Sequence, residues 1–180
     1  IAKKYVDLMG GKIEVSSSSQ GVGSTFTVEI PLLIAEHVET EEKEKLKKDT
    51  DLHGLHVLLA EDNDLNAEIA IALLEEQGMI VTRAADGKSV LAQFCNTDPG
   101  AFDLILMDIM MPEMNGYETT KAIRNLPDRP DGKVIPIIAM TANAFAEDVQ
   151  TALNAGMNDH VAKPVDMEIL TSVITKYIER

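Results

Sequence analysis

Short apolar runs alternate with longer stretches of helical spacing from residue 54 to the end of the chain. The runs have the length of strands, and in the segments between them apolar residues recur every three or four positions. This alternation is typical of repeated strand-helix units built around a parallel sheet. The predicted strands are 55–60, 79–84, 102–107, 135–140 and 160–162, and the predicted helices are 64–77, 87–96, 115–125, 145–154 and 166–178.

Three of these strands are apolar almost throughout. The first, third and fourth runs carry almost no polar residue, as expected of strands that are covered on both faces. We therefore place them at the centre of the sheet. The first helix carries an apolar stripe typical of an amphipathic helix, formed by Leu65, Ile69, Ala72 and Leu73, and the last helix carries a similar one, formed by Ile169, Leu170, Val173, Ile174 and Tyr177.

Composition then limits the class of protein. The 180 residues allow one domain, or one domain and a fragment, at roughly 100–200 residues per domain. A formal charge of -14 excludes a nucleic-acid binder, because such proteins neutralise phosphates with basic residues. The single cysteine, Cys95, cannot form an intramolecular disulfide, which favours the reducing cytosol. No apolar run reaches the ~20 residues of a membrane span, so we expect no direct membrane contact.

The distribution of charge predicts where domains meet. The segment 36–51 holds seven acidic residues and four lysines with almost no large apolar side chain, which is typical of a solvated linker or a short exposed helix. We predict an N-terminal fragment over 1–35, a charged linker over 36–53 and a complete domain over 54–180. The first residue is Ile1 rather than Met, so we expect a piece of a longer protein.

Polar side chains follow the predicted strands where each strand ends. They are Glu61 and Asp62, Asp108, Thr141 and Lys163. In an open parallel sheet these positions share one edge, where ligands bind. Each residue alone could be a helix cap, a turn residue or a solvated charge. Three carboxylates together repel one another unless a cation neutralises them, and hard oxygen ligands suit Mg²⁺. A hydroxyl and an ammonium opposite the cation favour phosphoryl transfer to a carboxylate, with Asp108 as the best nucleophile.

The motifs that carry these residues resemble the receiver domains of two-component response regulators. The resemblance covers roughly 54–180, and its motifs are VLLAEDNDLN (57–66), LILMDIMMPEMNGYE (104–118), IIAMTANA (137–144) and AGMNDHVAKPV (155–165). It implies an α/β, flavodoxin-like, doubly wound fold. That fold is a five-stranded parallel sheet of order 2-1-3-4-5 with helices on both faces.

The resemblance also implies a role for each site residue. Asp108 is the expected phosphoacceptor, and Mg²⁺ is held by Glu61, Asp62, Asp108 and the backbone carbonyl of Met110. Thr141 binds the phosphoryl group and shifts on phosphorylation, and Lys163 forms an ion pair with that group. The family usually has an aromatic residue where this chain has His160, which therefore acts either as a switch with Thr141 or as a spacer. The family also has a cis peptide bond before the residue that matches Pro164.

Residues 1–31 carry a second resemblance, to the end of the ATP-binding domain of histidine kinases. The sequence GVGSTFTVEIPL after LMGGKIEV is similar to the end of that domain, which has a helix, a glycine turn, a strand, the last glycine box and a final strand. A plain hairpin, with Gly21 and Gly23 serving only its turn, is the alternative. The earlier kinase motifs are missing and none of the four histidines lies in a phosphoacceptor helix. We therefore expect no useful ATP binding. The chain lacks the catalytic elements of a kinase, and it would count as an enzyme only in the sense that it catalyses its own phosphorylation.

Together these observations predict a phosphorelay receiver from a hybrid sensor histidine kinase. The expected partners are a phosphohistidine domain, of the parent chain or another protein, and a histidine phosphotransfer protein, docking on the apolar face of 64–77 and the loop after the last strand. We expect a cytoplasmic location, whether or not the parent is tethered to a membrane. The alternatives are a pseudo-receiver that binds partners without phosphorylation, an aspartate-based phosphohydrolase and a dimerisation scaffold.

Overall fold

The computed structural model describes residues 2–17, 24–31, 52–142 and 146–178. The chain divides into two compact units, Ile1–Lys45 and Leu46–Arg180. The glycine box at 21–23 and the charged segment 36–51 lie outside the described residues. Within the described residues, no helix combines the length and apolar character that crossing a bilayer requires.

The second unit is built on a five-stranded parallel sheet. Its strands are β3 (His56–Ala60), β4 (Ile80–Ala84), β5 (Leu104–Asp108), β6 (Ile137–Thr141) and β7 (Asp159–Ala162). They lie in the order β4-β3-β5-β6-β7, which is 2-1-3-4-5 when the strands of this unit are counted alone. The doubly wound, flavodoxin-like fold predicted from the sequence is therefore confirmed.

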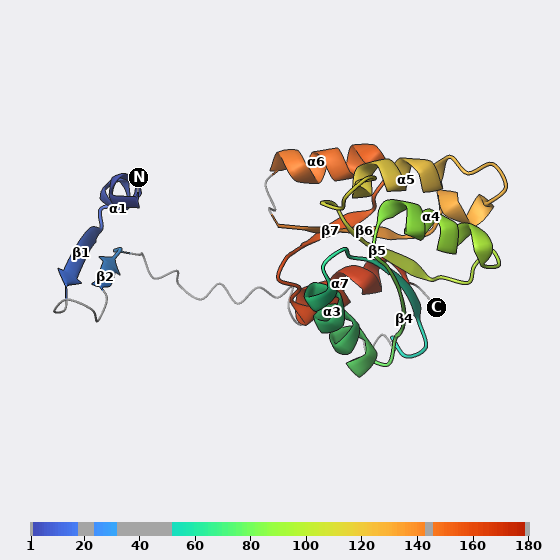
Figure 1. The fold of residues 1–180 in the computed structure, drawn as a ribbon, viewed down its shortest axis with the longest axis horizontal. Coiled ribbons are helices and arrows are strands. Elements are labelled where there is room, and N and C mark those ends of the chain that lie inside the picture. Colours follow the sequence, from blue (N-terminus) through green and yellow to red (C-terminus); the bar gives the residue numbers. More distant parts are fainter. Residues whose placement is uncertain (1, 18–23, 32–51, 143–145, 179–180) are drawn as a thin grey trace. The chain divides into compact units, whose positions relative to one another are not determined.

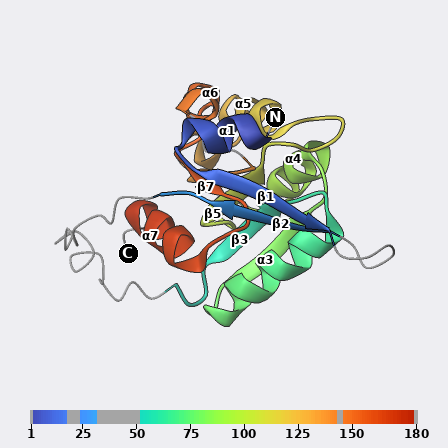
Figure 2. The ribbon, with the colours of Figure 1, turned by 90° about the vertical axis from the view of Figure 1, so that its left-hand side faces the viewer.

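Helices cover both faces of this sheet. They are α3 (Asp64–Glu76), α4 (Gly87–Asn96), α5 (Gly116–Arg124), α6 (Ala146–Ala155) and α7 (Met167–Tyr177), with a short 3-10 helix at Pro130–Lys133. In Figure 1, α4, α5 and α6 lie on one side of the sheet and α3 and α7 on the other, and Figure 2 shows the same division from the side. The observed helices and strands begin and end within two residues of the predicted ones.

Alternating side chains of the central strands fill two hydrophobic clusters. Leu58, Ile105 and Ile137 belong to the cluster under α4, α5 and α6, and their neighbours Leu59, Leu106 and Ile138 belong to the cluster under α3 and α7. Both faces of these strands are thus covered, which explains their continuously apolar sequences. Leu52 is buried in the second cluster, so it packs with this unit although it precedes residue 54, where the domain was predicted to begin.

The apolar stripe of α3 faces outward. The helix packs on the sheet through Ala67, Ala70 and Leu74. Leu65 and Ile69, which belong to the stripe identified in the sequence, are 64% and 53% exposed. Apolar residues therefore occupy two faces of this helix, and only the tertiary packing distinguishes the core face from the exposed one.

The first unit is a short helix followed by a hairpin. α1 (Ala2–Leu8) leads through a glycine turn to β1 (Lys12–Ser17), which pairs antiparallel with β2 (Ser24–Glu29). Gly10 has φ of 69°, a conformation that side chains other than glycine rarely adopt. A Cβ atom at Gly11 would lie 2.3 Å from the carbonyl oxygen of Glu29. The backbone conformation therefore favours glycine at position 10, and the close approach of the Glu29 carbonyl requires it at position 11.

Candidate functional site

The parallel register brings the ends of three strands to one edge of the sheet. Asp108 is the last residue of β5, Thr141 is the last residue of β6, and Lys163 directly follows β7. The backbone N–H of Lys163 donates to the carbonyl of Thr141 at 2.8 Å, which continues the pairing with β6 one residue beyond the end of β7. Thr141 is 7% exposed. Side chains from widely separated parts of the sequence thus meet at this edge.

Lys163 joins two buried carboxylates. Its Nζ atom lies 2.7 Å from Oδ2 of Asp108 and 2.5 Å from Oε2 of Glu61. Both carboxylates are almost fully buried, whereas the lysine side chain keeps partial contact with solvent. Because an unpaired buried charge is costly, this ammonium stabilises two acids that would otherwise repel each other.

Burial and ion pairing act in opposite directions on these groups. Burial raises the pKa of Asp108, and the hydrogen bonds that it accepts from Lys163 and from the Met110 backbone N–H, the latter at 3.1 Å, oppose that increase only in part. Burial alone would lower the pKa of Lys163, but its hydrogen bonds to Asp108 and Glu61 outweigh burial and raise it. The site therefore retains its ammonium and holds Asp108 in an environment that disfavours its negative charge.

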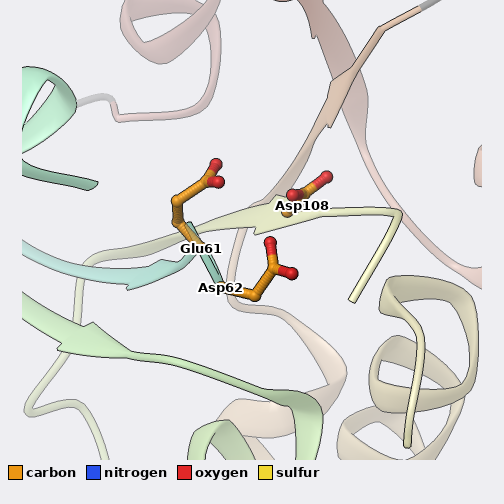
Figure 3. A group of neighbouring side chains, drawn as sticks. All are labelled: Glu61, Asp62 and Asp108. Atoms are coloured by element: carbon orange, nitrogen blue, oxygen red, sulfur yellow. The ribbon is translucent and has the colours of Figure 1, made fainter. Parts of the chain in front are cut away.

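Three carboxylates converge at the site. One oxygen from each of Glu61, Asp62 and Asp108 lies within 4.8 Å of the others. Figure 3 shows that Glu61 and Asp62 follow one strand, that Asp108 comes from another, and that the carboxylate of Asp62 points toward Asp108. Asp62 is exposed, so a bound ion could retain water molecules on that side. A few carboxylate oxygens with open positions for water are the donor set that Mg²⁺ prefers, and these residues fit it.

Each oxygen of the Glu61 carboxylate has its own partner. Oε1 accepts a hydrogen bond from the Asn66 side-chain amide at 3.1 Å and from the Asn63 backbone N–H at 3.3 Å, while Oε2 faces Lys163. The Asn63 side chain in turn accepts from the Asn66 N–H and caps α3. The first turn of α3 thus fixes the orientation of Glu61. No pattern in the sequence distinguishes Asn66 as a site residue.

Met110 and His160 are the two remaining predicted site residues. The side chain of Met110 is 77% exposed, and its backbone N–H is the group that contacts Asp108. His160 is half-buried on β7, where its Nδ1 atom lies 3.6 Å from a carboxylate oxygen of Asp159. Its role as a switch or as a spacer stays a prediction.

An apolar groove opens next to the site. It has a volume of about 310 Å³ and extends between α3 and the segment after β7. Its apolar lining includes Ile69 and Leu73 of α3 and Pro164 and Val165, which follow β7. Glu61, Asn66 and Lys163 also line it, so the groove adjoins the carboxylate cluster directly.

Comparison with known proteins gives consistent results. Residues 57–175 match the family described as the response regulator receiver domain. The aerobic respiration control sensor protein ArcB of Escherichia coli is 39% identical over 178 residues, which are 98% of this chain and 22% of that protein. Hybrid signal transduction histidine kinase I of Dictyostelium discoideum is 41% identical over 129 residues, which are 68% of this chain and 7% of that protein. The chain thus spans less than a quarter of the length of these two relatives.

A solved structure resembles the second unit. It is the receiver domain of the sensor histidine kinase PA1611 from Pseudomonas aeruginosa, described with a magnesium ion coordinated in the active site cleft. It is 37% identical, has a TM-score of 0.62, and the match covers 69% of this chain and 97% of that one.

Proposed function

We propose, on the premise that this chain belongs to the response regulator receiver domain family, that Asp108 takes a phosphoryl group from a phosphohistidine and passes it on or releases it by hydrolysis. The observation that carries the proposal is the contact of Lys163 with Asp108 at the edge of the sheet, beside Glu61 and Asp62. A nucleophile, a cation and a set of metal ligands are thus grouped where ligands of doubly wound proteins bind.

The chemistry follows from these positions. A carboxylate oxygen of Asp108 attacks the phosphorus atom in line with the phosphorus-nitrogen bond of phosphohistidine. A phosphorus-oxygen bond forms, and the electron pair of the broken bond stays on the imidazole. Lys163, already 2.7 Å from the Asp108 carboxylate, is placed to bind an oxygen of the transferred group, and the hydroxyl of Thr141 is the candidate for a second one.

Glu61, Asp62 and Asp108, with the backbone carbonyl of Met110, are the residues that would hold Mg²⁺. Two observations support this part of the proposal: the three carboxylates converge within 4.8 Å, and the related PA1611 domain is described with magnesium in its cleft. Bound Mg²⁺ supplies positive charge that offsets the negative charge of the phosphoryl oxygens.

Labelling with acetyl phosphate tests the function. We expect one phosphoryl group to be added to the chain when Mg²⁺ is present and none when Mg²⁺ is removed by chelation, because the crowded carboxylates otherwise repel the phosphate. Intact-protein mass spectrometry measures the addition, and peptide mapping locates it. A folded protein that takes up no phosphoryl group under either condition would instead support the alternative of a pseudo-receiver, which binds partners without phosphorylation.

The proposed partners are a phosphohistidine domain, of the parent chain or of another protein, and a histidine phosphotransfer protein. We propose that they dock on the exposed stripe of α3 and on the adjoining groove. Two features support this surface: the groove reaches Lys163, and the stripe is apolar although it faces outward. The exposed acids Glu68, Glu75 and Glu76 lie on the same helix, so the surface fits a partner whose apolar patch is surrounded by basic residues.

Substitution of Ile69 separates docking from chemistry. Ile69→Glu places a charge in the apolar stripe without disturbing the core, because this side chain is 53% exposed. We expect phosphotransfer from a phosphohistidine donor to slow by roughly tenfold or more, since a buried unpaired charge costs several kcal/mol, while labelling by acetyl phosphate stays unchanged. Val134→Glu is the matched control, because Val134 is exposed but precedes β6, at the opposite edge of the sheet. Equal transfer rates for the two variants would rule out this docking surface.

We propose that residues 1–35 are the end of a histidine kinase ATP-binding domain and that 36–53 are a linker. We also propose that the parent protein is a hybrid histidine kinase, located in the cytoplasm or tethered to a membrane. The alignment with ArcB supports this proposal, because it extends over 98% of the chain and so includes most of the N-terminal unit. The order of α1, β1 and β2 also agrees with the predicted helix, glycine turn and two strands.

A further inference from the structure

Arg83 lies beside the acidic turn that follows β3. It is in the edge strand β4, opposite Leu59 of β3 in the parallel register. Beyond the end of β3, the Glu61 N–H donates to the carbonyl of Ala84 at 3.1 Å, so the turn starts directly beside this part of β4. The Arg83 side chain is 27% exposed. Its guanidinium thus lies beside the turn from Glu61 to Asp64, on the side of the outer strand β4.

The guanidinium contacts the backbone of this turn. Nε and Nη2 donate to the Glu61 carbonyl at 3.2 and 3.1 Å, and Nη2 also faces the Asp62 carbonyl at 3.3 Å. The same nitrogen lies 2.7 Å from a carboxylate oxygen of Asp64, the first residue of α3. Arg83 therefore binds three of the four residues from Glu61 to Asp64.

These contacts use the carbonyl oxygens of Glu61 and Asp62. The carboxylate of Glu61 is bound by Lys163 and Asn66 instead, and the carboxylate of Asp62 converges with that of Asp108. The arginine thus fixes the main chain while the acidic side chains stay directed to the site. Arginine suits this role better than lysine, because its planar group presents several donors in a fixed geometry.

We propose that Arg83 is a positioning residue that holds the turn Glu61–Asp64 so that the Glu61 and Asp62 carboxylates face Asp108, and that it thereby sets the affinity of the site for divalent cations. This inference rests on the proposed function for its cation. It goes beyond that function by assigning a role to a residue that binds neither metal nor phosphate.

The direction in which the Mg²⁺ affinity changes on substitution of Arg83 distinguishes a positioning role from a purely electrostatic one. A positive charge near a cation site repels the cation. If Arg83 contributed only its charge, removing the guanidinium should therefore strengthen Mg²⁺ binding. Loss of positioning has the opposite effect, because displaced ligands bind more weakly. Groups that orient metal ligands typically contribute 10- to 100-fold to affinity. We therefore expect the positioning effect to exceed the charge effect at this partly exposed side chain.

The experiment compares Arg83→Gln, Arg83→Lys and Lys88→Gln with the unsubstituted chain. Lys88→Gln is the matched control, because Lys88 is a cation of α4 on the same edge of the sheet whose ion pair is with Glu113 rather than with the turn. Isothermal titration with MgCl₂ measures affinity, and circular dichroism melting verifies folding. Amide hydrogen exchange of residues 61–64, measured without Mg²⁺, reports on the turn independently of the metal.

We expect both Arg83 variants to bind Mg²⁺ roughly tenfold more weakly, with faster exchange at 61–64, and Lys88→Gln to bind within about twofold of the unsubstituted chain. Folded Arg83 variants that bind Mg²⁺ as tightly as the unsubstituted chain, or more tightly, would overturn the proposal, as would unchanged exchange. If the unsubstituted chain bound no Mg²⁺, the proposed function would fail, and the exchange measurement would still decide whether Arg83 positions the turn.

Discussion

Asp108→Asn is expected to abolish phosphoryl labelling and to raise the free energy of unfolding at neutral pH. The amide is too weak a nucleophile to attack phosphorus, so no aspartyl phosphate can form. Intact-protein mass after incubation with acetyl phosphate and Mg²⁺ should show only the unlabelled chain. Asp128→Asn, which changes an exposed acid in the loop after α5, is the control and should be labelled normally. A phosphoryl group on the Asp108→Asn chain would show that another residue accepts it.

The gain in stability follows from the raised pKa of Asp108. A carboxyl whose pKa is higher in the folded state contributes stability below its unfolded pKa, near 3.8, and that contribution is lost as the pH rises through the folded pKa. At neutral pH the ionised group therefore lowers stability, and asparagine removes this cost. Urea unfolding at pH 7 should show the variant to be more stable, with a smaller difference in acid. A less stable variant at pH 7 would contradict this account of the site.

Lys163→Met is expected to reduce both stability and labelling. It leaves Glu61 and Asp108 buried without their shared ammonium. Removing one partner of a fully buried pair costs about 3–5 kcal/mol, and because Lys163 is partly exposed we expect about 2–3 kcal/mol at neutral pH. The loss should shrink in acid, where the carboxylates are protonated, and on addition of Mg²⁺, which replaces the missing positive charge. Urea unfolding with and without Mg²⁺ measures these changes.

The same variant should be labelled on the order of 100-fold more slowly, as when one group that stabilises transition-state charge is removed. Lys176→Met is the matched control, because its ammonium pairs with Asp159 at 3.4 Å and is half exposed. An exposed ion pair of this kind contributes about 1 kcal/mol or less to the free energy of unfolding, and the control should be labelled at the normal rate. Equal labelling of the two variants would exclude a role for Lys163 in transfer.

Much of the fold was accessible from local sequence because a parallel sheet covered on both faces requires continuously apolar strands. Leu58 and Leu59 are adjacent, yet they belong to different hydrophobic clusters, so neither could be polar. The strand ends could also be predicted from the sequence, because Asp108 is a polar residue that follows four apolar ones, where the chain leaves the core. The assignment of individual roles to the site residues remains a proposal that the labelling experiments test.

Local patterns determined which segments are strands and helices and which polar side chains follow the strand ends, whereas the order of the strands was implied by the resemblance to receiver domains. They could do so because periodicity and strand ends are properties of neighbouring residues. Only the tertiary structure decided which apolar face of α3 is buried, how Asn66 orients Glu61, and that Arg83 binds a turn about twenty positions earlier in the chain. These features depend on how β3, β4 and α3 pack together, and the one-dimensional pattern carries no signal for contacts between residues so far apart in sequence.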